Sequence, residues 1–204
     1  MGFSSVLALT VSGALSNIAN AARVGAQGSP IPVKVVDTRT VASAQGLIVR
    51  RVAEAAATGA ELSELVAASA EVRKRVELMA LVPALEALRR SGRVPKVVAR
   101  VGDRLELKPF IKIGEDGQAH PAGVARSSAS GLRKMLERAV AAGGSSSARY
   151  VVMHTLAPER AQRLAAELGA RVPAAEIEVA PFTAVMGIHT GPGLLGIAWE
   201  KPFS

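Results

Sequence analysis

The chain has 204 residues, of which 49% are hydrophobic, 21% are charged and only 3% are aromatic. These values are typical of a globular protein whose core is built from Ala, Val, Leu and Ile. The 25 basic and 17 acidic residues give a net charge of +8, but few aromatic side chains are present to stack on bases, so nucleic-acid binding is not expected. The absence of cysteine excludes disulfides, thiolate metal sites and a cysteine nucleophile.

The N-terminal region matches no targeting signal. The first basic residue is Arg23, so the positively charged start of a signal peptide is missing. No stretch approaches the run of about 18 apolar residues that a membrane-spanning helix needs. We therefore expect a cytoplasmic protein without stable membrane insertion.

Strands and helices alternate in the first part of the chain. Apolar patterning predicts strands over residues 5–11 and 33–38, and helices over 17–24, 43–57 and 61–75. This alternation is typical of a parallel sheet covered by helices, and the apolar first strand is expected to be buried on both faces. Because two parallel strands cannot bury themselves, residues 1–76 are predicted to be a partial α/β domain whose N-terminal portion is missing.

The second part of the chain mixes hairpins and helices. Strands are predicted over residues 78–82, 105–113, 118–126, 150–155, 176–182 and 194–200, and helices over 83–90, 127–142 and 158–168. The turn at Glu115, Asp116 and Gly117 marks a hairpin. The predicted fold class is α/β, with a partial parallel-sheet α/β N-terminal domain followed by an α+β C-terminal domain over residues 77–204.

The turn after the first strand is the first candidate site. Ser12 and Ser16 flank the predicted start of a helix, where unpaired backbone amides and the helix dipole favour an anion. A serine at this position also caps helices as a matter of routine. Both interpretations remain open, since a capping hydroxyl can also donate to a carboxylate.

The segment Gly-Ile-His-Thr-Gly-Pro-Gly at residues 187–193 is the second candidate. Its three glycines and one proline predict a tight backbone path from which His189 and Thr190 project. An ordinary turn with an incidental histidine is the plainer alternative. Arg126, at the end of the hairpin, is a third candidate because a guanidinium matches a carboxylate or phosphate, although the sequence alone favours an ordinary surface arginine.

Known catalytic and metal-binding patterns are missing. The chain contains no nucleophile elbow, phosphate-binding loop or dinucleotide fingerprint. No histidine pair stands with a carboxylate at metal spacing, and His120 and His154 are interpreted as structural. We therefore expect no catalytic residue, no metal and no cofactor.

Three motifs resemble the DegV family of bacterial fatty-acid-binding proteins. They are Ser-Gly-Ala-Leu-Ser-Asn at residues 12–17, Leu-Glu-Ala-Leu-Arg-Arg-Ser-Gly-Arg-Val at 85–94, and the 187–193 segment followed by Leu-Leu-Gly-Ile. Three shorter matches follow the family's order at residues 36–38, 107–109 and 116–117. The resemblance covers essentially the whole chain, and the terminal motif is its most specific part.

The resemblance implies a non-enzymatic carrier that binds a long-chain fatty acid near the junction of its two domains. It implies that Ser16, His189 and Thr190 hold the carboxylate. Arg126 is similar to the family arginine beside the cleft, which is associated with a partner fatty acid kinase that makes acyl phosphate. The fatty acid is then a ligand, not a cofactor.

Two alternatives come from other classes. A truncated, ligand-free interaction or regulatory protein would expose apolar surface that favours dimers or a partner. A hydrolase with an unrecognised serine would turn over acyl esters, and we rank it last.

Overall fold

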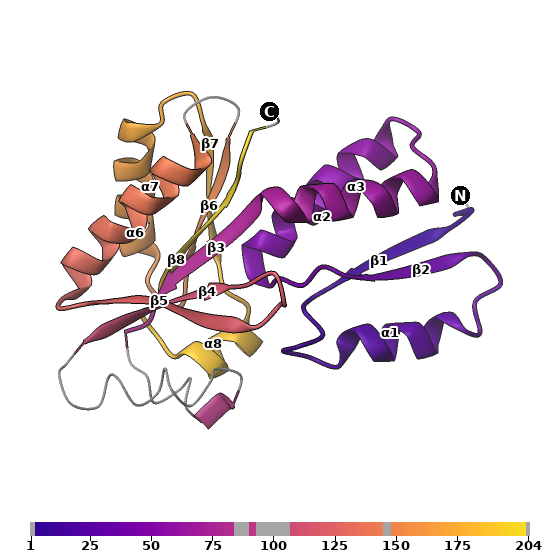
Figure 1. The fold of residues 1–204 in the computed structure, drawn as a ribbon, viewed down its shortest axis with the longest axis horizontal. Coiled ribbons are helices and arrows are strands. Elements are labelled where there is room, and N and C mark those ends of the chain that lie inside the picture. Colours follow the sequence, from indigo (N-terminus) through magenta and orange to yellow (C-terminus); the bar gives the residue numbers. More distant parts are fainter. Residues whose placement is uncertain (1–2, 84–89, 93–106, 145–147, 203–204) are drawn as a thin grey trace.

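The computed structural model describes residues 3–83, 90–92, 107–144 and 148–202, which form two β-sheets with surrounding helices (Figure 1). The smaller sheet pairs β1 (Val6–Thr10) in parallel with β2 (Val33–Asp37), and α1 (Ile18–Ala26) connects them. The larger sheet has six strands in the order β5-β4-β3-β8-β6-β7. The mixed α/β fold class predicted from the sequence is confirmed.

The larger sheet is mainly antiparallel, with one parallel pair at its edge. Strands β4, β3, β8 and β6 pair antiparallel with one another in that order, β5 pairs antiparallel with β4, and β7 pairs parallel with β6. The strands are β3 (Val76–Leu81), β4 (Lys108–Ile113), β5 (Ala119–Ala125), β6 (Arg149–His154), β7 (Glu176–Pro181) and β8 (Leu195–Glu200). The helix expected over residues 83–90 falls largely outside the described residues.

Helices cover both faces of the larger sheet. On one face lie α6 (Ser128–Gly143) and α7 (Pro158–Arg171), and on the other lie α2 (Ala42–Ala57) and α3 (Leu62–Arg75). The short helix α8 (Ala184–Thr190) follows β7. Figure 1 shows α2 and α3 between the two sheets, with β1, β2 and α1 on the side away from α6 and α7.

Side-chain alternation along β3 supplies both faces of the larger sheet. Met79 and Leu81 join the core under α6 and α7, whereas Leu78 and Ala80 face the opposite side. The α2 residues Leu47 and Ile48 pack into the core that contains Leu78. This core crosses the boundary expected after residue 76, and the division into domains 1–76 and 77–204 stays a prediction.

The smaller sheet is only partly buried. Thr10 is buried, but Val6 is 40% exposed and the residues between them are half-buried. The expectation that the first strand is buried on both faces is therefore wrong. Its physical reason is that two strands have too little area to build a core on each side.

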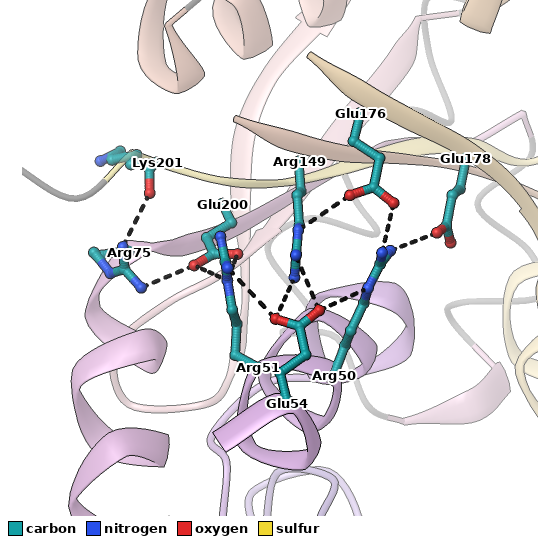
Figure 2. A network of polar contacts seen from close by, with 9 residues as sticks. All are labelled: Arg50, Arg51, Glu54, Arg75, Arg149, Glu176, Glu178, Glu200 and Lys201. Atoms are coloured by element: carbon teal, nitrogen blue, oxygen red, sulfur yellow. Dashed lines mark hydrogen bonds and ion pairs between the residues drawn. The ribbon is translucent and has the colours of Figure 1, made fainter. Parts of the chain in front are cut away.

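Arginine–glutamate contacts join α2 and α3 to the larger sheet (Figure 2). The Glu200 side chain on β8 is only 1% exposed, and its carboxylate accepts from Arg51 Nε at 2.8 Å and from Arg75 Nη2 at 2.8 Å. A carboxylate taken out of water needs such charged partners to offset its lost hydration. One buried carboxylate thus holds two helices against one strand.

A second group of contacts continues this network at the surface. Arg149 on β6 reaches Glu54 of α2 at 2.9 Å, and Arg50 of α2 reaches both Glu176 and Glu178 of β7 at 2.6 Å. The hydrogen bond from Arg149 lowers the pKa of Glu54, and the positive charges of Arg149 and Arg51 act in the same direction. These side chains are partly exposed, so water screens their attraction.

We predict that Glu200→Gln lowers the free energy of unfolding by about 3 kcal/mol, because Arg51 and Arg75 lose their shared buried counter-charge. Urea denaturation measures this difference. The matched control is Glu77→Gln, since Glu77 is 45% exposed and pairs with Lys201 at the surface; its loss should cost under about 1 kcal/mol. Equal effects of the two substitutions would contradict the role assigned to Glu200.

Glu54 should make the stability of the folded protein sensitive to acid. Because its pKa is lower in the folded state, its contribution to stability is present at neutral pH and is lost as the pH falls below about 4.3, the ordinary glutamate value. Thermal unfolding of the wild type and of Glu54→Gln, compared from pH 7 to pH 3, should therefore show a gap that narrows with acid. A gap independent of pH would refute this linkage.

Candidate ligand-binding site

A cavity of about 780 Å³ lies between the two sheets. Its walls come from the loop after β1, the loop after β2 with the start of α2, strands β3 to β5, and α8. The volume falls within the range of about 300–1,000 Å³ common for small-molecule sites. The larger apolar lining residues are Val11, Leu15, Ile18, Val41, Leu78, Ile111, Ile113, Phe182, Val185, Met186 and Leu194.

The floor of the cavity is the face of the larger sheet that points away from α6 and α7. Ala80 of β3 lies opposite Ile111 of β4, and Ile113 of β4 lies opposite Ala119 of β5. Strand alternation places these side chains on one face, and all four line the cavity. The floor is thus a continuous apolar surface.

Polar groups line the cavity as well, and within the described part of the chain none of them is an aspartate or glutamate. Lys112 of β4 belongs to the lining, but strand alternation places its exposed side chain on the face opposite Ile111 and Ile113, so it supplies no charge inside the cavity. An acid inside an apolar cavity would repel an anionic ligand, and its absence leaves the described lining compatible with one. The neutral polar lining residues are Ser16, Asn17, Ser43, Gln45, Ser91, Thr183 and Thr190.

Ser16 lies just before the start of α1. Its Oγ accepts a hydrogen bond from Ile18 N at 3.3 Å, and its own backbone N donates to Ser12 O at 3.1 Å. Asn17 occupies the N-cap position without a side-chain capping bond, and the first turn of α1 contains no acidic residue. Ser16 can therefore act both as a helix cap and as a ligand donor. Its Oγ accepts from the Ile18 amide, and its hydroxyl proton is left to donate to a ligand.

The prediction of one tight turn over residues 187–193 is wrong, because a helix occupies the first part of this segment. Residues 187–190 form the second half of α8, which begins after Thr183, whose Oγ1 accepts from Met186 N at 3.5 Å. Only Gly191 and Gly193 have positive φ, at 75° and 82°. Gly187 lies inside the helix, where a Cβ would be 3.4 Å from Thr155 Cγ2, an ordinary van der Waals contact that does not itself require glycine. Glycines within this short apolar run masked the helical pattern.

His189 and Thr190 end α8 in different environments. His189 is half-buried and lines the cavity, and its imidazole makes no hydrogen bond within the described residues. Thr190 is 3% exposed, and its hydroxyl donates to Met186 O at 2.9 Å while lying 3.4 Å from Thr155 Oγ1. The Thr190 proton is therefore already used inside the helix, which leaves this hydroxyl an acceptor.

Arg126 lies apart from the other three candidates. It follows the end of β5 as an exposed residue, directly before the α6 N-cap Ser127, and does not line the cavity. The structure thus brings Ser16, His189 and Thr190 to one cavity and leaves Arg126 outside. His120 contacts the Asp116 carboxylate at 2.9 Å, and His154 Nδ1 accepts from Ala157 N at 3.3 Å, so both histidines have structural partners.

Sequence reasoning missed the loop after β2 and the first turn of α2. Ser43 and Gln45 of α2 line the cavity, and Gln45 Nε2 donates to Leu9 O at 3.0 Å. Arg39 in the loop and Ala42, the first residue of α2, have positive φ values of 50° and 53°, an unusual conformation that is common at functional sites. A usable signal existed, because ligands bind at the carboxyl ends of parallel strands and this loop follows such an end.

The described residues form neither a metal site nor a membrane span. No group of three His, Asp or Glu side chains there lies close enough together to hold a metal ion. None of the helices described is both long and apolar enough to cross a bilayer.

Comparison with known proteins identifies the family. The model of an uncharacterised family, DegV, matches residues 1–202. A DegV domain-containing protein of Streptomyces coelicolor is 36% identical over 197 residues, which cover 96% of this chain and 70% of that protein. A DegV family protein from Thermus thermophilus, described for its fatty acid binding, matches with a TM-score of 0.88 and 30% identity over 98% of this chain and 71% of that one.

A third comparison concerns the fold alone. The fatty acid kinase (Fak) B3 protein of Streptococcus pneumoniae, whose structure is loaded with linoleic acid, matches with a TM-score of 0.88 at 21% identity, over 98% of this chain and 73% of that one. The family model, the relatives and the shared fold agree with the motifs at residues 12–17 and 187–193. This chain belongs to the DegV family.

Proposed function

We propose that this protein binds a long-chain fatty acid as a carrier. The observation that carries the proposal is the cavity itself, which combines an apolar floor with a described lining free of carboxylates. An acyl chain gains free energy from apolar burial, and its carboxylate needs hydrogen-bond donors where it leaves water.

The carboxylate would lie between the start of α1 and the end of α8. Ser16 and His189 line the cavity from these two elements, and each has a donor group that no described residue occupies. The N-terminal end of α1 adds the positive end of its helix dipole. Thr190 would help chiefly by fixing α8, because its proton is bonded to Met186 O.

Similarity supports this assignment. The Thermus thermophilus relative, at 30% identity, is described for its fatty acid binding. The alternative of a ligand-free interaction protein is favoured by a different observation, the exposure of Phe3 (82%), Ile18 (55%) and Val24 (59%) around the small sheet. Ligand-dependent stabilisation separates the two functions, because only a carrier is stabilised by a fatty acid.

We further propose that the carrier presents its fatty acid to a fatty acid kinase for acyl-phosphate formation. Arg126 supports this idea because it is exposed and lies outside the cavity. A guanidinium in that position is available to the carboxylate or phosphate groups of a partner.

The first prediction is that protein purified from a lipid-replete host carries a fatty acid, which mass spectrometry of the denatured sample detects. The substitutions Ser16→Ala and His189→Ala should each weaken oleate binding about tenfold, because the buried carboxylate of oleate then loses one hydrogen-bond donor. The matched control is Ser63→Ala, because Ser63 is exposed on α3 and lies outside the cavity. An empty wild-type protein with no thermal shift on adding oleate would refute the proposed binding.

The second prediction separates binding from presentation. Arg126→Ala should leave oleate affinity unchanged but slow acyl-phosphate production by a fatty acid kinase about tenfold, as expected for the loss of one charged contact. Arg133→Ala is the control, because Arg133 is 68% exposed on α6. Unaltered production by the Arg126 variant would remove this arginine from the proposed contact.

A further inference from the structure

The tip of the β4–β5 hairpin contacts the loop after β1. Ser12, which is 1% exposed, donates from Oγ to Gly117 O at 2.8 Å across a separation of 105 residues. Gly117 is buried at the hairpin turn and has a φ of 77°. The hairpin and the loop are thus joined by a buried hydrogen bond at the rim of the cavity, whose lining begins at Val11.

Only glycine fits at this contact. A Cβ built on Gly117 would lie 2.3 Å from Ser12 Oγ and 3.3 Å from the Arg39 backbone. The first distance is far inside van der Waals contact, so any side chain at position 117 must push the hairpin away or turn the Ser12 hydroxyl out of its bond. The close approach therefore requires glycine at 117 independently of φ.

Ser12 is also hydrogen-bonded to the backbone of Ser16. The Ser12 carbonyl accepts from both Leu15 N and Ser16 N at 3.1 Å, and Ser12 N donates to Thr40 O at 2.8 Å. The backbone of the serine that lines the cavity is therefore held directly by Ser12. Any displacement of Ser12 moves the start of α1 with it.

Arg73 of α3 joins the hairpin to the loop after β2. Its Nη2 donates to Gly114 O in the hairpin at 2.8 Å and to Arg39 O in the loop after β2 at 3.0 Å. Asp37 connects the two loops again, accepting from Gly13 N at 3.0 Å and from Arg39 N at 2.8 Å. The hairpin tip and both cavity loops thus form one hydrogen-bonded unit.

We propose that Ser12 and Gly117 are positioning residues, through which the β4–β5 hairpin holds Ser16 in the orientation that binds the ligand head group. Neither residue lines the cavity, so both act through Ser16. The inference rests on the proposed fatty acid binding and adds to it the element that sets the geometry of the site.

The test compares two glycine variants of the full chain. Gly117→Ala should weaken oleate binding about tenfold, the size expected for one displaced donor. The matched control is Gly123→Ala in the same hairpin, where φ is 126° and a Cβ would lie 3.8 Å from the nearest atom. The φ angle of Gly123 is at least as unfavourable for alanine as that of Gly117, but Gly123 does not touch the loop after β1. The Gly123→Ala variant should therefore bind oleate as tightly as the wild type.

Amide hydrogen exchange provides a readout that needs no ligand. Without oleate, the amides of residues 13–18 should exchange faster in Gly117→Ala than in Gly123→Ala, because local opening of the loop becomes easier. If wild-type protein fails to bind oleate but this difference is present, the proposed function fails while the contact stands. If wild-type protein binds and Gly117→Ala binds equally well, the positioning role is overturned.

Ser12→Ala keeps the test decisive if Gly117→Ala does not fold. It removes the hydroxyl bonded to Gly117 O, and should weaken binding in the same direction. The double variant should bind no worse than Gly117→Ala alone, because removing Ser12 Oγ also removes the atom that lies 2.3 Å from the new Cβ. Additive losses would show that the two residues act separately and would overturn the proposal.

Discussion

The smaller sheet cannot bury both of its faces, and its dependence on the larger sheet determines where the cavity lies. Two strands and one helix provide little core of their own, which the 40% exposure of Val6 makes visible. The apolar face of α2, with Leu47 and Ile48, packs instead on the larger sheet. The space left between the two sheets beside α2 is the cavity, lined by the first residues of that helix.

Both apolar packing and polar contacts hold the two sheets together, at different places. Away from the cavity, Glu200 holds α2 and α3 through Arg51 and Arg75. At the cavity rim, Arg73 and Ser12 join backbone carbonyls of segments distant in the chain. Directional bonds suit the rim because a cavity supplies no packed neighbours to fix a loop. The result is an apolar space with polar groups fixed in orientation at its edge.

Much of the fold could be predicted from the sequence because its elements carry strong local signals. The strand at Val33–Asp37, the helix at Ala42–Ala57 and the Asp116-Gly117 hairpin lie within a few residues of their expected positions. The pattern of α8 is hard to recognise because Gly187 interrupts its seven residues and Gly191 ends it, and such short runs do not distinguish helix from turn. Burial of the first strand was misjudged because apolar composition does not reveal how many strands flank it.

The candidate site was only partly accessible to sequence reasoning. Ser16 and His189 stood out through their motifs, and they do line one cavity. The residues of the cavity floor did not stand out, because Leu78 and Ala80 have the pattern of any core strand. Periodicity cannot show that one face of a strand borders a cavity. The Ser12–Gly117 contact was equally hidden, since nothing local links residues so far apart. The resemblance to a family supplied roles that spacing alone did not.

The span of the Ser12–Gly117 bond also bears on the order in which the molecule forms. Contacts between residues 105 positions apart close a long loop and form late, after local helices and hairpins. During synthesis, which proceeds from the N-terminus, the loop after β1 leaves the ribosome long before the hairpin that holds it. Helix α8, which forms another wall of the cavity, is synthesised later still. The complete cavity is thus a product of the final stages of folding, and the fatty acid proposed to bind there would stabilise the finished protein instead of guiding its early steps.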